Sequence, residues 1–160
     1  MDLLSAAREH LSRDYHSLSD EWEALTSLAH SEPERVILLK WVFAESPAYW
    51  ATRATAGELL LQDDENETWK IIERLVDSSD PDDNGTVLTL FERLGDPRGL
   101  EFARRWLTEK THPSTQLDAT VYLKEAYPEH VRQRLEALTL HDNQNIQRRA
   151  RELLAEFESR

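Results

Sequence analysis

The residue pattern with the most definite chemistry is a run of oxygen-bearing side chains near the middle of the chain. Asp80, Asp82 and Asn84 occupy the first, third and fifth positions of a D-x-D-x-N-G pattern. Carboxylate and amide oxygens at this spacing are the first ligands of a helix-flanked calcium-binding loop. The twelfth position of such a loop supplies a bidentate glutamate, but here it is Phe91, and Glu92 comes one place late. The three oxygen-bearing residues are therefore candidate metal ligands in a pattern that lacks its last member.

The same segment also has the features of a helix start. Asp80 precedes Pro81, and Asp82 and Asp83 follow. An aspartate accepts hydrogen bonds from the free N–H groups of a first helical turn, and proline fits that turn. Acidic side chains there also interact favourably with the helix dipole. The sequence leaves both interpretations open, a calcium-binding loop and a capped helix start.

No pattern of side chains in the sequence assigns a catalytic reaction. The chain has six histidines and no cysteine. The absence of cysteine excludes a thiolate nucleophile and any cysteine-ligated metal. It also lacks the H-E-x-x-H zinc motif, a glycine-rich phosphate loop and the G-x-S-x-G nucleophile motif. We therefore expect a non-enzymatic protein without a cofactor.

Acidic side chains outnumber basic ones, and they are unevenly spread. The 160 residues include 31 acidic and 19 basic side chains, a net charge of −12. Residues 1–97 hold 21 acidic and 8 basic side chains, whereas residues 98–160 hold 10 and 11. Such a surface repels phosphate backbones, so we expect no nucleic-acid partner. Complementary fields favour a basic protein partner, while the alternative, that the charge only keeps the protein soluble, stays open.

Four of the five tryptophans divide into two groups. Trp41, Trp69 and Trp106 fall on apolar helix stripes, which predicts that they pack in the core. Trp50 follows Tyr49 at an expected helix start, where an aromatic side chain could serve either the core or an interface. Both roles stay open for Trp50.

Helical periodicity runs through most of the chain and predicts an all-α protein. Only four glycines and six prolines occur, too few for the turns of a many-stranded protein. Residues 2–12 and about 20–30 are expected to form two short helices. A third helix starting at Pro33 is apolar nearly all round between Val36 and Phe43, which places it at the centre of the core.

The apolar segments predict a cytoplasmic protein with no membrane partner. The longest apolar run, Val36 to Leu39, is too short to span a bilayer. Residues 1–20 lack the continuous apolar stretch of a signal peptide. The absence of cysteine agrees with an intracellular location.

From residue 46 onward the chain repeats itself. Ser46-Pro47, Asp80-Pro81 and His112-Pro113 are each expected to open a helical stretch, at separations of 34 and 32 residues. Helix pairs at a fixed period of this length are typical of an α-solenoid. The second helices of the pairs are expected over residues 66–76, 97–110 and 128–140, and a last helix over about 145–157.

These repeats predict an α-α superhelix of about four to five helix pairs. The expected organisation is a single domain, 1–160. It consists of N-terminal helices and a capping unit (1–45), three degenerate helix-pair repeats (46–142) and a C-terminal capping helix (143–160).

The stretch from Leu94 to Leu100 resembles the turn between the two helices of a HEAT-like repeat, of the ARM/HEAT superfamily. Gly95 can take the left-handed conformation after a helix, Asp96 can cap the next one and Pro97 can occupy its first turn. The turn before Pro128 matches less well, because Ala-Tyr stands there where the repeat has Gly-Asp. The resemblance implies a protein-binding scaffold in which the second helix of each pair lines a concave surface.

On this resemblance, the outward residues of the second helices are candidate partner-binding residues. Their charge grades from acidic at residues 67–77 to mixed in the later second helices, although charged helix faces are also often only solvated. With the aromatic residue at the start of the first repeat, the candidates are Glu67, Lys70, Glu73, Arg74, Asp77, Arg104, Arg105 and Trp50.

The sequence therefore predicts a protein–protein interaction module that presents an acidic concave surface to a basic protein partner. Small size and acidic charge are also features of immunity or antitoxin-type inhibitors, which is the narrower form of this expectation. Two alternatives stand beside it. The Gly-Asp-Pro-Arg turn also occurs in HEAT-like bilin lyases, which implies a lyase or chaperone subunit, and the loop at residues 80–85 would suit a calcium-responsive helical protein.

Overall fold

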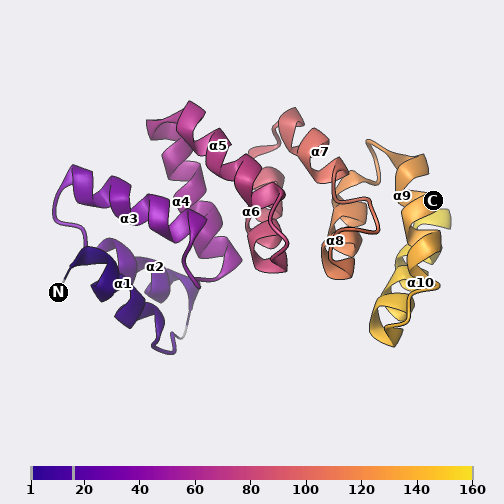
Figure 1. Ribbon diagram of the computed structural model, residues 1–160, viewed down its shortest axis with the longest axis horizontal. Coiled ribbons are helices and arrows are strands. Elements are labelled where there is room, and N and C mark those ends of the chain that lie inside the picture. The colour runs from indigo at the N-terminus through magenta and orange to yellow at the C-terminus, as the bar shows by residue number, and fades with distance from the viewer. Residues whose placement is uncertain (1, 16, 160) are drawn as a thin grey trace. The chain divides into compact units, whose positions relative to one another are not determined.

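The computed structural model describes residues 2–15 and 17–159 (Figure 1). Within these residues the chain forms ten α-helices and no β-strand, which confirms the all-α prediction. No helix in this part of the chain is long and apolar enough to cross a membrane. The chain divides into two compact units, Met1–Asp77 and Ser78–Arg160. The assignment of both units to one domain stays a prediction.

The first unit consists of two helix pairs and a single helix. Its helices are α1 (Leu3–Leu11), α2 (Leu18–Thr26), α3 (Glu32–Ala44), α4 (Trp50–Asp63) and α5 (Glu65–Val76). Helix α1 packs on α2 and α3, while α4 packs on α2, α3 and α5. The pair α1–α2 therefore packs on the pair α3–α4 through two contacts, α1 on α3 and α2 on α4.

Helix α3 supplies much of the core of the first unit, as its apolar sequence predicts. Leu38, Val42 and Phe43 are each at most 1% exposed, and Trp41 is 6% exposed. Ile37, by contrast, is 52% exposed, so one side of the helix faces solvent. The reason is that α3 packs on α1 and α4 and leaves its remaining face uncovered.

Buried polar contacts fix α4 against its neighbours. The hydroxyl of Thr52 donates a hydrogen bond of 2.5 Å to the buried carboxylate of Glu21 on α2. The guanidinium of Arg53, only 3% exposed, donates from Nε to the backbone oxygen of Phe43 on α3 at 3.1 Å. A buried polar group without such a partner would destabilise the fold, so these contacts specify how α2, α3 and α4 meet.

The second unit is built around α8. Its helices are α6 (Pro81–Leu94), α7 (Pro97–Arg104), α8 (Pro113–Leu123), α9 (Pro128–Leu138) and α10 (Gln144–Glu158). Helix α8 contacts all four of the others, and α6 also packs on α7, as α9 does on α10. Among the fully buried side chains, Leu123 on α8 and Leu135 on α9 are each at most 2% exposed.

Proline and capping residues begin the helices of the second unit as the sequence predicts. Proline occupies the first turn of α6, α7, α8 and α9. Between α6 and α7, Gly95 has φ 61°, in the left-handed region. The Oδ1 atom of Asp96 accepts a hydrogen bond of 2.9 Å from the backbone N–H of Arg98. The roles predicted for Gly95, Asp96 and Pro97 are therefore confirmed.

Two predicted helix starts are wrong by a few residues. Ser46 and Pro47 do not open a helix, because α4 begins only at Trp50. The backbone N–H of Ser46 donates to the carbonyl of Trp41 at 3.0 Å, so this residue closes α3 instead. Helix α2 begins at Leu18, earlier than expected, because the hydroxyl of Ser17 caps it.

The helix predicted over residues 97–110 ends early, at Arg104. The N–H groups of Trp106 and Leu107 bond to carbonyls three residues back, at 3.0 and 3.2 Å, which tightens the last turn and stops the helix. Trp106 then lies 2% exposed in the core. Burial of this large ring outweighs the helical preference of the residues that follow.

Candidate functional site

Helix α5 has one buried face and one exposed face. Its start is capped by Asp64, whose Oδ1 accepts a hydrogen bond of 3.2 Å from the N–H of Glu67. Ile72, Leu75 and Val76 are at most 3% exposed and form the buried face. The five residues that the sequence predicts as partner-binding all lie on the exposed face: Glu67, Lys70, Glu73, Arg74 and Asp77.

The exposed face of α5 is predominantly acidic. Residues 64–77 carry five acidic and two basic side chains. Lys70 Nζ lies 2.5 Å from Glu67 Oε1, and this hydrogen bond holds the pKa of Lys70 above its ordinary value. Because acidic side chains outnumber basic ones by three, the face offers negative charge to a partner.

The two candidate arginines lie on the second unit and contact aromatic rings. The guanidinium of Arg104 is 5.2 Å from the centroid of the Tyr127 ring, and that of Arg105 is 4.7 Å from the Phe102 ring. The hydroxyl of Tyr127 donates a hydrogen bond to Glu101, which raises the pKa of Tyr127. The arginine side chains are exposed but oriented by these cation–π contacts.

Trp50 stands at the surface at the start of α4. It is 43% exposed and its neighbour Tyr49 is 63% exposed, whereas Ala48 is buried. An aromatic pair so placed is accessible to a partner, as the interface interpretation requires. Among the other tryptophans, the core role predicted for Trp41 and Trp106 is confirmed, since they are 6% and 2% exposed.

The candidate calcium ligands take part in a capped helix start. Asp80 Oδ1 accepts a hydrogen bond of 2.9 Å from the N–H of Asp82, and residues 81–94 are helical. Asn84 is buried, donating to the carbonyl of Ser78 and accepting from the hydroxyl of Thr115 on α8. In residues 2–15 and 17–159, no three His, Asp or Glu side chains are grouped to hold a metal.

This arrangement confirms the interpretation of residues 80–85 as a helix start. Calcium binding there stays a prediction that the helical geometry does not support, because an encircling loop is replaced by a straight helical turn.

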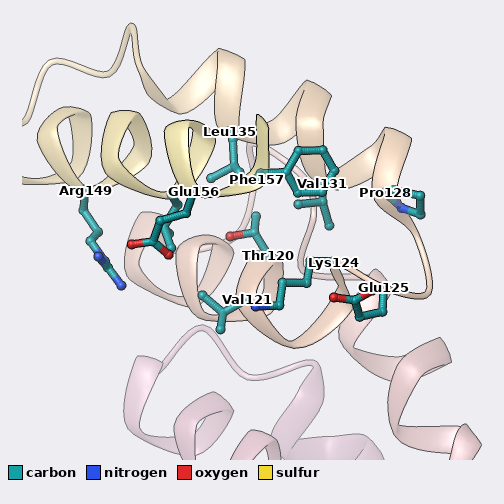
Figure 2. A pocket seen from close by; sticks show the side chains of 11 residues that line it. Thr120, Val121, Lys124, Glu125, Pro128, Val131, Leu135, Arg149, Glu156 and Phe157 are labelled. Carbon is teal, nitrogen blue, oxygen red and sulfur yellow. The ribbon is translucent and has the colours of Figure 1, made fainter. Parts of the chain in front are cut away.

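A groove in the second unit, which the sequence did not predict, lies among α8, α9 and α10 (Figure 2). Its volume is about 280 Å³. The apolar residues that line it are Val121 from α8, Val131 and Leu135 from α9, and Leu153 and Phe157 from α10. One signal for it is present in the sequence: α8 carries apolar residues on more than one face, so a single neighbouring helix cannot cover them.

The chain is therefore an all-helical protein of two compact units, with an acidic helix face in the first and an apolar groove in the second. No family model matches the sequence, and no curated protein or solved structure matches it either.

Proposed function

We propose that this protein is a non-enzymatic protein-binding module of the HEAT-like α-solenoid type, and that it presents the exposed face of α5 to a basic protein partner. The observation that carries the proposal is the segregation of α5 into a buried apolar face and an exposed face of mainly acidic residues. The narrower form of the same proposal is that this protein is an immunity or antitoxin-type inhibitor and that its partner is a basic toxin domain.

The packing order of the helices supports the solenoid part of the proposal. In the second unit α6 packs on α8 and α8 on α10, so alternate helices stack on one another. In the first unit α1 packs on α3 and α2 on α4. Contacts between each helix and the next but one are what stacked helix pairs produce, because every pair buries its apolar face on its neighbour.

The distribution of charge supports the choice of partner. Residues 1–77 carry 16 acidic and 7 basic side chains, a net charge of −9 with histidine neutral. A field of this sign attracts a basic surface and speeds its encounter with the protein. In the second unit, Arg104 and Arg105, oriented by aromatic rings, are proposed separately to pair with carboxylates of a protein partner.

Affinity capture with matched variants tests the proposal. Full-length protein is immobilised and exposed to extract of the cells that produce it, in parallel with the triple variant Glu67→Lys, Glu73→Lys, Asp77→Lys. We expect the unchanged protein to retain a basic protein that is released by salt, because screening weakens the attraction. The triple variant is expected to lose it.

The control carries the same change of charge elsewhere in the first unit: Asp20→Lys, Glu23→Lys and Glu45→Lys, all exposed residues outside α5. If this control loses the partner as fully as the α5 variant does, overall charge rather than the α5 face is responsible and the proposal fails. Retention of the partner by the α5 variant would also refute it.

A further inference from the structure

The groove of the second unit has a buried apolar floor and an exposed apolar residue on one wall. Val131 and Leu135 are 1% and 2% exposed, so their positions are held by packing. Val121 on the opposite wall is 41% exposed. The Phe157 ring is covered on one side by the guanidinium of Arg132, 5.5 Å from its centroid. The groove is therefore formed in advance and still presents apolar surface.

Its size suits side chains rather than a large cofactor. The volume of about 280 Å³ is roughly twice the ~150 Å³ of an apolar cavity that binds benzene. It therefore accommodates two large apolar side chains. Clefts between helices that are lined mainly by apolar residues are also common binding sites.

The rim of the groove carries charges of both signs. Lys124 and Glu125 lie at one end, and Arg149 and Glu156 at the other (Figure 2). Arg149 pairs with Glu152 at 3.2 Å. Within the part of the chain that the structure describes, the side chains of Lys124 and Glu156 form no hydrogen bond or ion pair. An apolar centre inside a charged rim is the composition of a protein-binding surface.

We propose that this groove binds an amphipathic helix of a partner protein. Two large apolar side chains, three or four positions apart on that helix, fill the groove, because residues at this spacing share one face. An acidic residue of the helix pairs with Lys124 and a basic residue pairs with Glu156. The proposal does not depend on the acidic face of α5, since the groove lies entirely within the second unit.

Two synthetic peptides serve as probes. Each is an alanine-based helix of about 16 residues, long enough to populate the helical state, with two leucines four positions apart. In one peptide a glutamate precedes the leucines and a lysine follows them; in the other these two charges are exchanged. Binding to the full chain is measured by fluorescence anisotropy. We expect the protein to prefer one charge order by about tenfold, because only one order pairs both rim charges correctly.

Exchange of the rim charges then provides the decisive measurement. The double variant Lys124→Glu, Glu156→Lys is expected to prefer the other peptide by about the same factor. The control Glu109→Lys, Lys110→Glu, with the same exchange at exposed residues outside the groove, is expected to keep the original preference. Replacing both leucines of the peptide by alanine, or introducing Val121→Asp, is expected to weaken binding at least tenfold.

Three results would overturn the proposal: neither leucine peptide binds better than its alanine version, the preference does not exchange in the double variant, or Val121→Asp leaves binding unchanged. The triple α5 variant separates this proposal from the proposed function. It is expected to bind the peptides as the unchanged protein does, so failure at the groove and failure at α5 give different results.

Discussion

At Gly99 helix α7 lies close to α6. A Cβ atom at this position would lie 2.8 Å from Cβ and Cγ of Phe91 and 2.9 Å from the hydroxyl of Tyr122. The Phe91 ring in turn stacks on Phe102 at 6.1 Å and on Trp106 at 6.5 Å. Because the ring is held from several sides, it cannot move away at low cost.

We therefore expect Gly99→Ala to lower the free energy of unfolding by about 1–3 kcal/mol, the usual cost of overpacking a core. Chemical denaturation followed by circular dichroism measures the change. Gly95→Asn is the control, since Gly95 has open space around it and asparagine tolerates the left-handed conformation. An unchanged free energy of unfolding in Gly99→Ala would show that the contact does not limit the approach of the helices.

Glu92 on α6 and Asp118 on α8 form a pair of like charges next to Tyr122. Partial desolvation raises the pKa of Glu92, an exposed residue, and the charge of Asp118 raises it further. Partial desolvation also raises the pKa of Asp118, an exposed residue, against the opposing effect of Arg149. The pKa of Tyr122 is raised by burial, by Glu92 and by Asp96. The ionised pair is therefore unfavourable in the folded protein.

Because of this pair, the stability of the folded protein falls as the pH rises. A carboxyl whose pKa is raised by folding binds more protons in the folded than in the unfolded chain. Stability from this pair is therefore lost as the pH rises from the ordinary pKa values, 3.8 for Asp118 and 4.5 for Glu92, through the raised ones. Above the raised values the cost is present in full.

We expect Asp118→Asn to lower the pKa of Glu92 towards its ordinary value and to flatten the loss of stability in this range of pH. Titration of the carboxyl groups by NMR gives the pKa, and urea denaturation at several pH values gives the stability. Glu125→Gln, an equal change of charge, is the control. A Glu92 pKa that is the same in Asp118→Asn as in the unchanged protein would contradict the coupling.

The structural roles of some individual residues could be predicted from the sequence, and the roles of others could not. Asp96 and Gly95 act within one turn of the backbone, so their roles follow from local sequence. Gly99 gives no such signal, because its role depends on Phe91 and Tyr122, which come from other helices. The buried bond between Thr52 and Glu21 was unpredictable for the same reason, since 31 positions separate its partners.

At the scale of elements, helix caps decide where the segments begin. Asp2, Ser31 and Asn143 cap α1, α3 and α10 through hydrogen bonds to N–H groups of the first turn. Each such bond satisfies a donor that the helix itself leaves unpaired. Helix α4 begins without a side-chain cap, after Tyr49, which explains why its start could not be placed from the sequence.

Substitutions of Asp80, at the start of α6, distinguish a helix cap from a calcium-binding loop. We expect Asp80→Ala to lower the free energy of unfolding by about 0.5–2 kcal/mol, the range for loss of a cap, and Asp80→Asn to preserve most of it. Thermal unfolding of the unchanged protein is expected to be the same with calcium and with a chelator. A rise in melting temperature with calcium, abolished by Asp80→Ala, would contradict the helix-start interpretation and support the loop.

In the second unit, the helix starts were predicted better than the end of α7. Prolines in the first turns of α6, α7, α8 and α9 marked those starts correctly. The early end of α7 depends instead on burial of Trp106, a tertiary effect that no local pattern encodes. Leu107 and Leu138 each stand ten residues after the first proline of their helix, Pro97 or Pro128. Leu107 nevertheless lies beyond the end of α7, whereas Leu138 is the last residue of α9.

At the scale of the whole molecule, charge is the property that the sequence predicts most directly. The net charge of −9 on residues 1–77 follows from counting, and the exposure of the acidic residues of α5 agrees with the expected amphipathic pattern. The division into two compact units could not be predicted in this way, because it depends on which helices contact one another. The groove needed the same information, since three helices contribute its apolar lining.

The central claim is that the acidic face of α5 guides association with a basic partner, and the association rate constant tests it most directly. It is measured by stopped-flow mixing with the captured partner, at rising salt, for the unchanged protein and for the Glu67→Lys, Glu73→Lys, Asp77→Lys variant. We expect the unchanged protein to associate at least tenfold faster at low salt and to lose this advantage as screening increases. Equal rates, with the same dependence on salt, would contradict the account.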